Sequence, residues 1–291
     1  MSNIPPPHDD ATTIHPMRLQ SLGAERGVAW VREAWRVFAS RPFAFASLLA
    51  ALLMLALVLS VFGWVGSIVV TLALPLVSLV FMAATQSLVA GGVDHPWQAV
   101  AGLARIEGRR ARALLLLCLL YAIGMTVLFS VSVSIDQGSM QRLIELFAAP
   151  RTPTSIAEID RLLASDSLQD GITVRLLGSL LLSIPFWHAP ALVWWGRQSL
   201  WQALFSSTLG VWRSKGAYAL YGLTLIACAL GLTTVIGVAL SIVDSPGSIR
   251  VAIAGLAMVL AVVFYVSLWF SFIDTFGLRR PAAPLPNDLE T

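Results

Sequence analysis

Six long apolar blocks constrain the fold of this chain more than any other feature. They cover residues 43–62, 65–90, 111–134, 176–195, 217–243 and 251–273. An α-helix rises about 1.5 Å per residue, so blocks of roughly 20 residues match the hydrocarbon core of a bilayer. Apolar residues make up 57% of the chain and charged residues 12%, a balance that argues against a soluble globular domain. The sequence therefore predicts an all-α integral membrane protein with six transmembrane helices.

Polar segments flank the apolar blocks at both ends. Residues 1–23 contain no apolar stretch typical of a cleavable signal peptide, so we expect the first span to act as the insertion signal. We interpret residues 1–23 and the Pro-rich residues 279–291 as disordered ends. Between them, residues 24–278 form the expected six-helix membrane domain, with an outer loop at 135–170.

An amphipathic stretch that carries tryptophan and arginine precedes each pair of spans. Trp-Gln-Ala-Val at 97–100 recurs as Trp-Gln-Ala-Leu at 201–204, whereas the stretch at 24–38 shares the pattern only. We expect three units, each of one interfacial helix and two spans. The predicted interfacial residues are Trp30, Trp35, Trp97, Trp201, Trp212, Arg109 and Arg213.

These interfacial helices allow two interpretations. Basic amphipathic helices lie in the headgroup plane and can recruit an anionic lipid or a partner helix. They also serve as elbows that turn the chain back into the bilayer, and the sequence favours this second role. We expect membrane lipids as partners, with other membrane proteins or a second copy of this chain as further candidates.

The distribution of arginine predicts the orientation. Most of the 19 basic residues lie in segments that would share one side of the membrane with the N-terminus, whereas the loop at 135–170 holds three arginines against six acidic residues. Because cationic segments resist translocation, we expect both termini in the cytoplasm of a bacterium and the protein in its inner membrane. The net charge of +3 then reflects orientation and gives no support for nucleic-acid binding.

The outer loop contains one helix-start signal. Ser155 with Glu158 resembles a capping box that opens a short amphipathic helix. A ligand-gating lid and a structured cap on the outer surface both fit this pattern. We favour the cap, because no convergent polar cluster accompanies the helix.

His188 is the one ionisable residue well inside a predicted span. It follows Trp187 and lies between Pro185 and Pro190, where we expect a kinked helix with freed backbone carbonyls. Broken helices at depth often line cavities, so Trp187 and His188 are candidate functional residues. The alternative is a structural histidine that pairs with a freed carbonyl or with a serine of a neighbouring helix.

Asp274 closes the last span and is the third candidate functional residue. A carboxylate at a helix C-terminus opposes the helix dipole, so we expect a cationic partner. The arginines expected near its depth are Arg279, Arg280, Arg109 and Arg213. A structural ion pair is favoured over a proton- or ion-coupling carboxylate.

Signatures of enzymes, cofactors and metals are missing from the sequence. It contains no phosphate-binding glycine loop, zinc-protease motif, Cys-x-x-Cys pair or nucleophile elbow. Cys118 and Cys228 lie in different spans and suggest packing rather than a disulfide. Small residues spaced four apart near Gly231 and Gly237 allow close helix approach in the fifth span. We predict no catalytic, cofactor-binding or metal-binding residue, and no enzyme.

Three motifs resemble those of an uncharacterised family of bacterial six-span inner-membrane proteins. Gly-x-x-Trp at 27–30, followed by the Ala-Trp to Pro pattern at 34–42, is similar to the start of that family's first span. Residues 188–193 are similar to its Phe-x-Pro-Ala-Leu-Val stretch, with His188 in the place of Phe, and residues 203–213 resemble its Ala-x-x-x-Ser helix. The family broadly resembles the membrane domain fused to some glycerophosphodiester phosphodiesterases. The resemblance implies a six-span fold and no catalytic residue.

Two functions follow from these patterns. The first is a non-enzymatic role in envelope or lipid-related organisation, because the well-patterned features are interfacial. The alternative is a transporter or lipid-handling protein with a cavity around Trp187 and His188.

Overall fold

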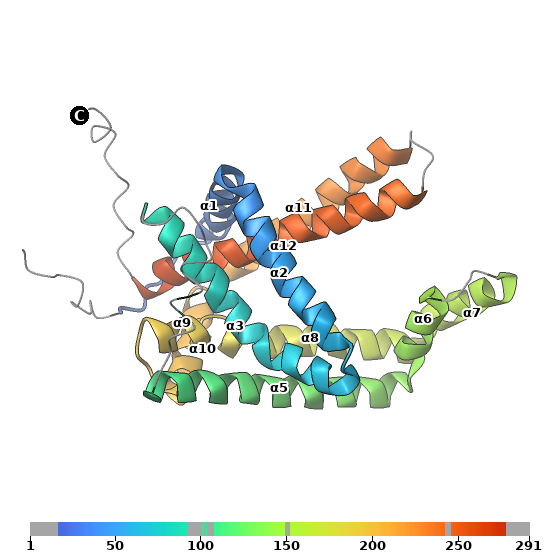
Figure 1. The fold of residues 1–291 in the computed structure, drawn as a ribbon, viewed down its shortest axis with the longest axis horizontal. Helices are drawn as coiled ribbons and strands as arrows, with labels where there is room; N and C mark the ends of the chain where they lie inside the picture. Colours follow the sequence, from blue (N-terminus) through green and yellow to red (C-terminus); the bar gives the residue numbers. More distant parts are fainter. Residues whose placement is uncertain are drawn as a thin grey trace, which may run out of the picture.

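The computed structural model describes residues 17–91, 101, 103, 108–148, 152–241 and 246–277. Within these ranges the regular structure is entirely α-helical (Figure 1). The helices are α1 (Arg26–Ser40), α2 (Pro42–Ser60), α3 (Gly63–Val89), α5 (Gly108–Asp136), α6 (Ser139–Ala148), α7 (Pro153–Leu163), α8 (Asp166–Phe186), α9 (Ala189–Trp194), α10 (Leu200–Arg213), α11 (Lys215–Ser241) and α12 (Pro246–Phe276).

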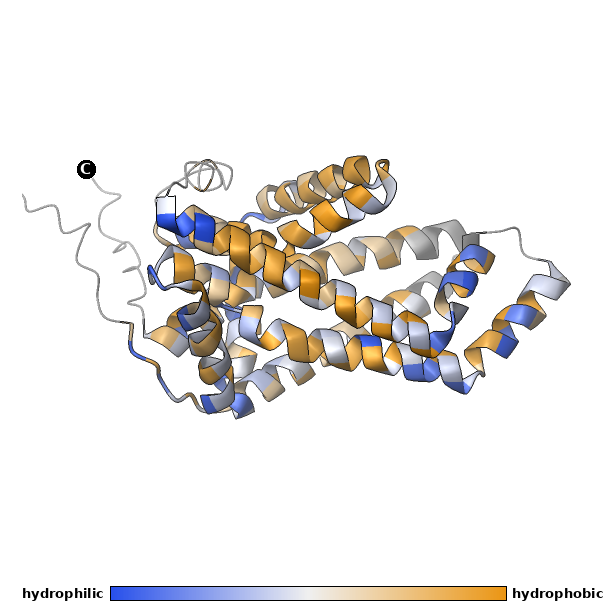
Figure 2. Ribbon diagram, turned by 90° about the horizontal axis from the view of Figure 1, so that it is seen from below, coloured by the Kyte–Doolittle hydropathy of each residue, from blue (hydrophilic) through white to orange (hydrophobic). Residues whose placement is uncertain are grey.

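Six segments are long and apolar enough to cross a membrane. They are Pro42–Ser60, Gly63–Val89, Gly108–Asp136, Asp166–Trp194, Lys215–Val238 and Val251–Phe276. Figure 2 shows apolar residues along most of the length of these helices. Many of them, such as Leu55, Leu116 and Leu230, are exposed, which would be unfavourable in an aqueous environment. The structure therefore confirms the predicted all-α integral membrane fold. The fourth span begins ten residues earlier than the apolar block at 176–195, because α8 continues through polar residues toward α7.

The spans pack as three antiparallel pairs, two of which meet at α12, while the α5–α8 pair contacts α3, α9 and α10. The pairs are α2 with α3, α5 with α8, and α11 with α12, and α12 also contacts α1, α2, α3 and α10. In Figure 1 the α5–α8 pair and the α11–α12 pair diverge from the end where α1, α9 and α10 gather. The main core lies at this end, where Trp30, Phe81 and Phe272 are fully buried.

Helix α1 packs against protein along part of its apolar face. Gly27, Trp30, Val31, Ala34 and Phe38 recur at helical spacing and are buried against α11 and α12. The sequence places Trp30 at the membrane interface, but the structure buries it completely. The amphipathic pattern is the same whether the apolar face meets lipid or another helix, which explains the difference. Trp35, on the same helix, is 47% exposed.

The segment before α1 joins the two ends of the described chain. Arg18 donates its backbone N–H to the carbonyl of Phe276 (3.1 Å), and Gln20 donates to that of Thr275 (2.9 Å). Leu22 donates its N–H to the Oγ of Ser214 at the start of α11 (3.3 Å). Residues 17–22 therefore lie across the C-terminal end of α12.

Helix α10 exposes part of its predicted apolar face. Trp201 and Trp212 are 70% and 71% exposed, whereas Ala203 and Gly210 are buried on the opposite side. In chain order this helix precedes α11 and α12, as α1 precedes α2 and α3. Of the middle interfacial helix only residues 101 and 103 are described, and Trp97 lies outside the described residues.

Asp136 and Arg175 hold together the ends of α5 and α8 that flank residues 137–165. The Asp136 side chain is 1% exposed and accepts from Gly138 N–H (2.8 Å) and from Arg175 Nη2 (3.2 Å). Arg175 also donates to Ser132 Oγ (3.1 Å), which in turn donates to the carbonyl of Gly171 (2.9 Å). The sequence pattern does not predict this pairing of Asp136 with Arg175.

The helix start in the outer loop differs from the prediction. Thr152, rather than Ser155, is the N-cap of α7, and Ser155 completes the capping box as the third helical residue. Pro153 explains the shift, because its fixed φ angle and missing N–H suit the first helical position. Glu158 therefore plays no part in the cap.

Glu158 instead joins α7 to α6 by an exposed ion pair. Arg142 Nε donates to Glu158 Oε1 at 2.9 Å. This hydrogen bond, with the positive charge of Arg142, lowers the pKa of Glu158 from its ordinary value of 4.5. The pair therefore stabilises the fold at neutral pH, and the stabilisation is lost as the pH falls through the lowered pKa.

We expect a small, pH-dependent effect of Glu158→Gln on thermal stability in detergent. The variant should unfold slightly below the wild-type protein at pH 7, and the gap should narrow as the pH falls through the lowered pKa of Glu158, because the wild-type side chain then becomes protonated. A gap that does not narrow at acidic pH would contradict the assigned role of the charge.

The small residues of α11 do not make the expected close approach. A Cβ placed on Gly222, Gly231 or Gly237 would meet no atom within 4 Å of it. The spacing allows helix contact, but in the described residues no other helix lies close to α11 at these three positions. The close contact occurs elsewhere, at Gly27 of α1, whose Cα lies against the backbone of Ala217 and Tyr221.

Candidate functional site: an intramembrane cavity beside a broken helix

The fourth span is broken between α8 and α9, where the prolines indicate a kink. Pro185 lies inside α8 and Pro190 lies in the first turn of α9, so Trp187 ends one helix and His188 caps the next. Prolines remove backbone donors and interrupt the helical hydrogen-bond ladder. Ser207 of α10 bridges the break, because its Oγ accepts from His188 N–H and donates to the carbonyl of Ile184, each at 3.1 Å.

The break places His188 in a buried polar chain. Its Nε2 lies 2.8 Å from the hydroxyl of Tyr218, which lies 2.9 Å from Thr275 Oγ1. The imidazole is fully buried and packs against the rings of Phe272 and Phe276. The Nδ1 atom has no hydrogen-bond partner in the described protein. His188 therefore links α9, α11 and α12.

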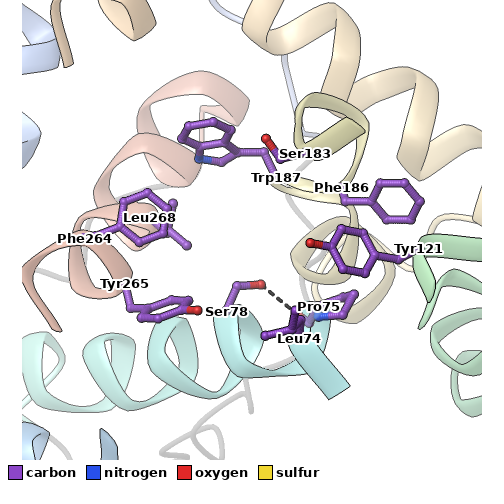
Figure 3. A pocket seen from close by; sticks show the side chains of 10 residues that line it. All are labelled: Leu74, Pro75, Ser78, Tyr121, Ser183, Phe186, Trp187, Phe264, Tyr265 and Leu268. Carbon is purple, nitrogen blue, oxygen red and sulfur yellow. Dashed lines mark hydrogen bonds between the residues drawn. The ribbon is translucent and has the colours of Figure 1, made fainter. Parts of the chain in front are cut away.

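Trp187 turns the other way and lines a cavity of about 230 Å³ between α3, α5, α8 and α12 (Figure 3). The wall is mostly aromatic and aliphatic. Its residues are Leu74, Pro75, Ser78, Tyr121, Ser183, Phe186, Trp187, Phe264, Tyr265 and Leu268. His188 is absent from this set, so the expected cavity around both Trp187 and His188 includes only the tryptophan.

Polar groups from four helices converge on this cavity. Figure 3 shows the hydroxyls of Tyr121 and Tyr265 pointing inward from opposite walls. Neither phenol has a protein hydrogen-bond partner in the described chain, and the buried indole nitrogen of Trp187 has none either. Ser78 and Ser183 donate to carbonyls of their own helices at 2.8 Å. The cavity thus combines an apolar wall with three unsatisfied polar groups.

The third candidate, Asp274, lies away from this cavity at the end of α12. Its Oδ2 accepts from Arg26 Nε (2.9 Å) and from the indole nitrogen of Trp30 (2.8 Å), with a further bond from Arg26 Nη2. This arrangement corrects the predicted pairing in part, since neither Arg109 nor Arg213 bonds to Asp274. Arg279 and Arg280 lie outside the described residues. The geometry is that of a structural ion pair that attaches α1 to α12.

The phenol hydroxyls of the cavity were not among the residues predicted from the sequence. Tyr121 and Tyr265 lie near the middle of the spans Gly108–Asp136 and Val251–Phe276. A tyrosine at this depth needs a hydrogen-bond partner for its hydroxyl, so its position in the middle of a span could have indicated a polar site. The convergence itself depends on packing between spans that are distant in sequence. Among the described residues no group of three His, Cys, Asp or Glu side chains is placed to hold a metal ion.

Comparisons with known proteins agree with the membrane fold. The chain is similar to a Burkholderia thailandensis protein named a probable inner membrane protein, with 27% identity over 277 residues, which is 93% of this chain and 98% of the relative. No family model matches the chain, and no solved structure does. The likeness and the six spans together indicate a multi-pass inner-membrane protein.

Proposed function

We propose that this protein binds an amphipathic, lipid-like molecule within the bilayer and handles it without catalysing a reaction. The observation that carries the proposal is the mostly apolar cavity lined by Trp187, Tyr121 and Tyr265, where the indole nitrogen of Trp187 is buried without a partner and neither phenol hydroxyl bonds to the described protein. This role corresponds to the lipid-handling alternative suggested by the sequence.

The buried indole nitrogen of Trp187 has no partner in the described protein. A buried donor without a partner costs about 1–3 kcal/mol, and no water is available in the hydrocarbon core to replace the partner. A ligand that carries an ester, a carbonyl or a hydroxyl oxygen would satisfy the donors of Trp187, Tyr121 and Tyr265 together. The aromatic walls would pack against its apolar part.

The position and size of the cavity indicate how such a ligand would bind. Pro75, Tyr121 and Tyr265 all lie near the middle of their spans, and transporters commonly bind substrates at this depth beside broken helices. The volume of about 230 Å³ is smaller than the roughly 300–1,000 Å³ of sites that enclose a drug-sized ligand. In this proposal the cavity therefore holds the polar segment of the molecule, while its apolar tail extends into the bilayer.

The proposal includes an orientation with both termini in the cytoplasm. It is supported by the excess of arginine in the segments on that side and by the acidic composition of residues 135–170. Reporter fusions at Thr291 and within the outer loop would test this orientation. The resemblance to the membrane domain fused to some glycerophosphodiester phosphodiesterases suggests a glycerolipid as the ligand class, and this too remains a proposal.

A second candidate function is envelope organisation through contacts with other membrane components. The observation that favours it is the exposure of Trp201, Phe205 and Trp212 along one face of α10. Crosslinking from this face to a defined partner, without any ligand in the cavity, would support this second function over the first.

We expect Ser183→Trp to abolish retention of a co-purified lipid, because the added indole fills the cavity. Removal of single polar groups by Trp187→Phe or Tyr265→Phe should weaken retention about fivefold each, the equivalent of one hydrogen bond of about 1 kcal/mol. Native mass spectrometry of the protein in mild detergent measures the bound fraction. Trp64→Phe, at an exposed tryptophan far from the cavity, is the matched control and should change nothing.

The proposal fails if the wild-type protein retains no ligand under these conditions. It also fails if Ser183→Trp, shown to be folded, retains the same ligand in the same amount as the wild-type protein.

A further inference from the structure

A second hollow lies between α1, α11 and α12, with a volume of about 330 Å³. Its wall is almost entirely apolar. The residues that matter for the argument are Val31, Arg32 and Trp35 of α1, Cys228 and Leu232 of α11, and Val263 of α12. On α12 it uses Leu260 and Val263, whereas the Trp187 cavity uses Phe264, Tyr265 and Leu268, so the two hollows lie on different faces of that helix.

Only some of the arginines of α1 have a carboxylate partner in the described protein. Arg26 is paired with Asp274 and lies 3.6 Å from Glu33. Arg32 and Arg36 are exposed, and neither forms an ion pair or a hydrogen bond with the described protein. Because they are spaced four apart, these two guanidinium groups lie on one side of the helix, and Arg32 belongs to the wall of the hollow.

The surroundings make an unpaired guanidinium here unfavourable without an external anion. Cys228 and Leu232 belong to the span Lys215–Val238, and Val263 belongs to the span Val251–Phe276. An arginine beside membrane-spanning segments normally reaches an anionic partner or the lipid headgroups. Within the described residues no carboxylate fills this role for Arg32. Lipid phosphate is the anion that a membrane supplies at such a place.

We infer that this hollow is a binding site for an anionic phospholipid. One acyl chain packs against Val31, Cys228, Leu232 and Val263, and the phosphate lies against Arg32 and Arg36. The half-exposed indole of Trp35 sits between them, at the boundary between apolar and polar groups that tryptophan prefers. Charge complementarity selects an anionic headgroup over a zwitterionic one. This site goes beyond the proposed function, since it shares no residue with the Trp187 cavity.

The test uses the full chain in mild detergent, with defined additions of phosphatidylglycerol or phosphatidylcholine, read by native mass spectrometry. The wild-type protein should retain phosphatidylglycerol preferentially. Arg32→Gln should lower that retention about fivefold, since each cation near a membrane surface contributes about 1 kcal/mol, and Arg36→Gln should add to the loss. Arg32→Lys should keep most of the binding. Cys228→Trp, which fills the hollow, should abolish it with both arginines intact.

Arg213→Gln is the matched control, because Arg213 is an exposed arginine without a protein partner on the other amphipathic helix, α10. An equal loss with Arg213→Gln would overturn the site in favour of general surface attraction. Equal retention of the two lipids by the wild-type protein would also overturn it, as would a protein dimer that depends on Arg32 in place of bound lipid. Ser183→Trp should leave the Arg32-dependent preference for phosphatidylglycerol over phosphatidylcholine unchanged, so failure of this site and failure of the proposed function can be told apart.

Discussion

Replacement of Asp274 by alanine is expected to destabilise the folded protein by about 3 kcal/mol, because it leaves two partly buried donors without their acceptor. In the native fold one carboxylate oxygen accepts from Arg26 and from the indole nitrogen of Trp30. Its loss leaves the buried indole N–H of Trp30 without an acceptor and leaves Arg26 with only its longer contact to Glu33. These bonds attach α1 to α12, so α1 should detach before the other helices.

Thermal unfolding in detergent, followed by tryptophan fluorescence and by loss of the monodisperse peak, measures this effect. Asp274→Asn keeps an acceptor for Trp30 but removes the charge, so its stability should lie between those of the wild type and Asp274→Ala. Glu158→Ala is the control, because it breaks an exposed ion pair that contributes little to stability. Equal unfolding temperatures for Asp274→Ala and Glu158→Ala would contradict the assigned role of Asp274.

Gly27→Ala is expected to be about as damaging, although it adds a single methyl group. The new Cβ would overlap the carbonyl oxygen of Ala217 and lie 2.6 Å from the backbone nitrogen of Tyr221. Both contacts are backbone atoms inside α11, so neither can rotate away as a side chain would. Helix α1 would have to move off α11, which would separate the packed rings of Trp30 and Tyr221. We expect a loss of about 3 kcal/mol, at the upper end for overpacking.

The same substitution on α11 supplies the control. Gly222→Ala and Gly231→Ala place their Cβ atoms in open space, so they should leave stability unchanged or raise it by up to about 1 kcal/mol through helix propensity. Opposite signs for Gly27→Ala and Gly222→Ala are therefore expected in one thermal unfolding assay. Similar small effects at all three positions would show that α1 is not seated on α11 as described.

The spans were predictable from the sequence because hydropathy and length act locally. Each of the six blocks is long and apolar enough on its own to indicate a membrane helix, and the structure has a helix at each. The break at Trp187 and His188 was equally accessible, since the effect of Pro185 and Pro190 on a helix is a property of the residues themselves.

What could not be predicted depends on contacts between distant residues. The bond from Arg26 to Asp274 joins positions 248 residues apart, and nothing local to Asp274 favours Arg26 over the arginines closer in sequence. An amphipathic helix also shows the same pattern whether its apolar face meets lipid or protein, so the burial of Trp30 is not visible in the sequence. The cavity has the same origin, because Ser78, Tyr121 and Tyr265 come from three different spans.

The seating of the first helix on the last pair of spans has a consequence for biosynthesis. Helix α1 leaves the ribosome well before α11 and α12, yet its buried face packs on these two helices. The contacts of Arg18 and Gln20 with the last turn of α12 are similarly delayed. Gly27 and Trp30 therefore lack their partners on α11 and α12 while the intervening spans are inserted. In a chain whose synthesis stops before α12, this side of α1 would stay uncovered and open to quality-control factors. The contacts between the N-terminal segment and α12 can therefore form only once the final span is in the membrane.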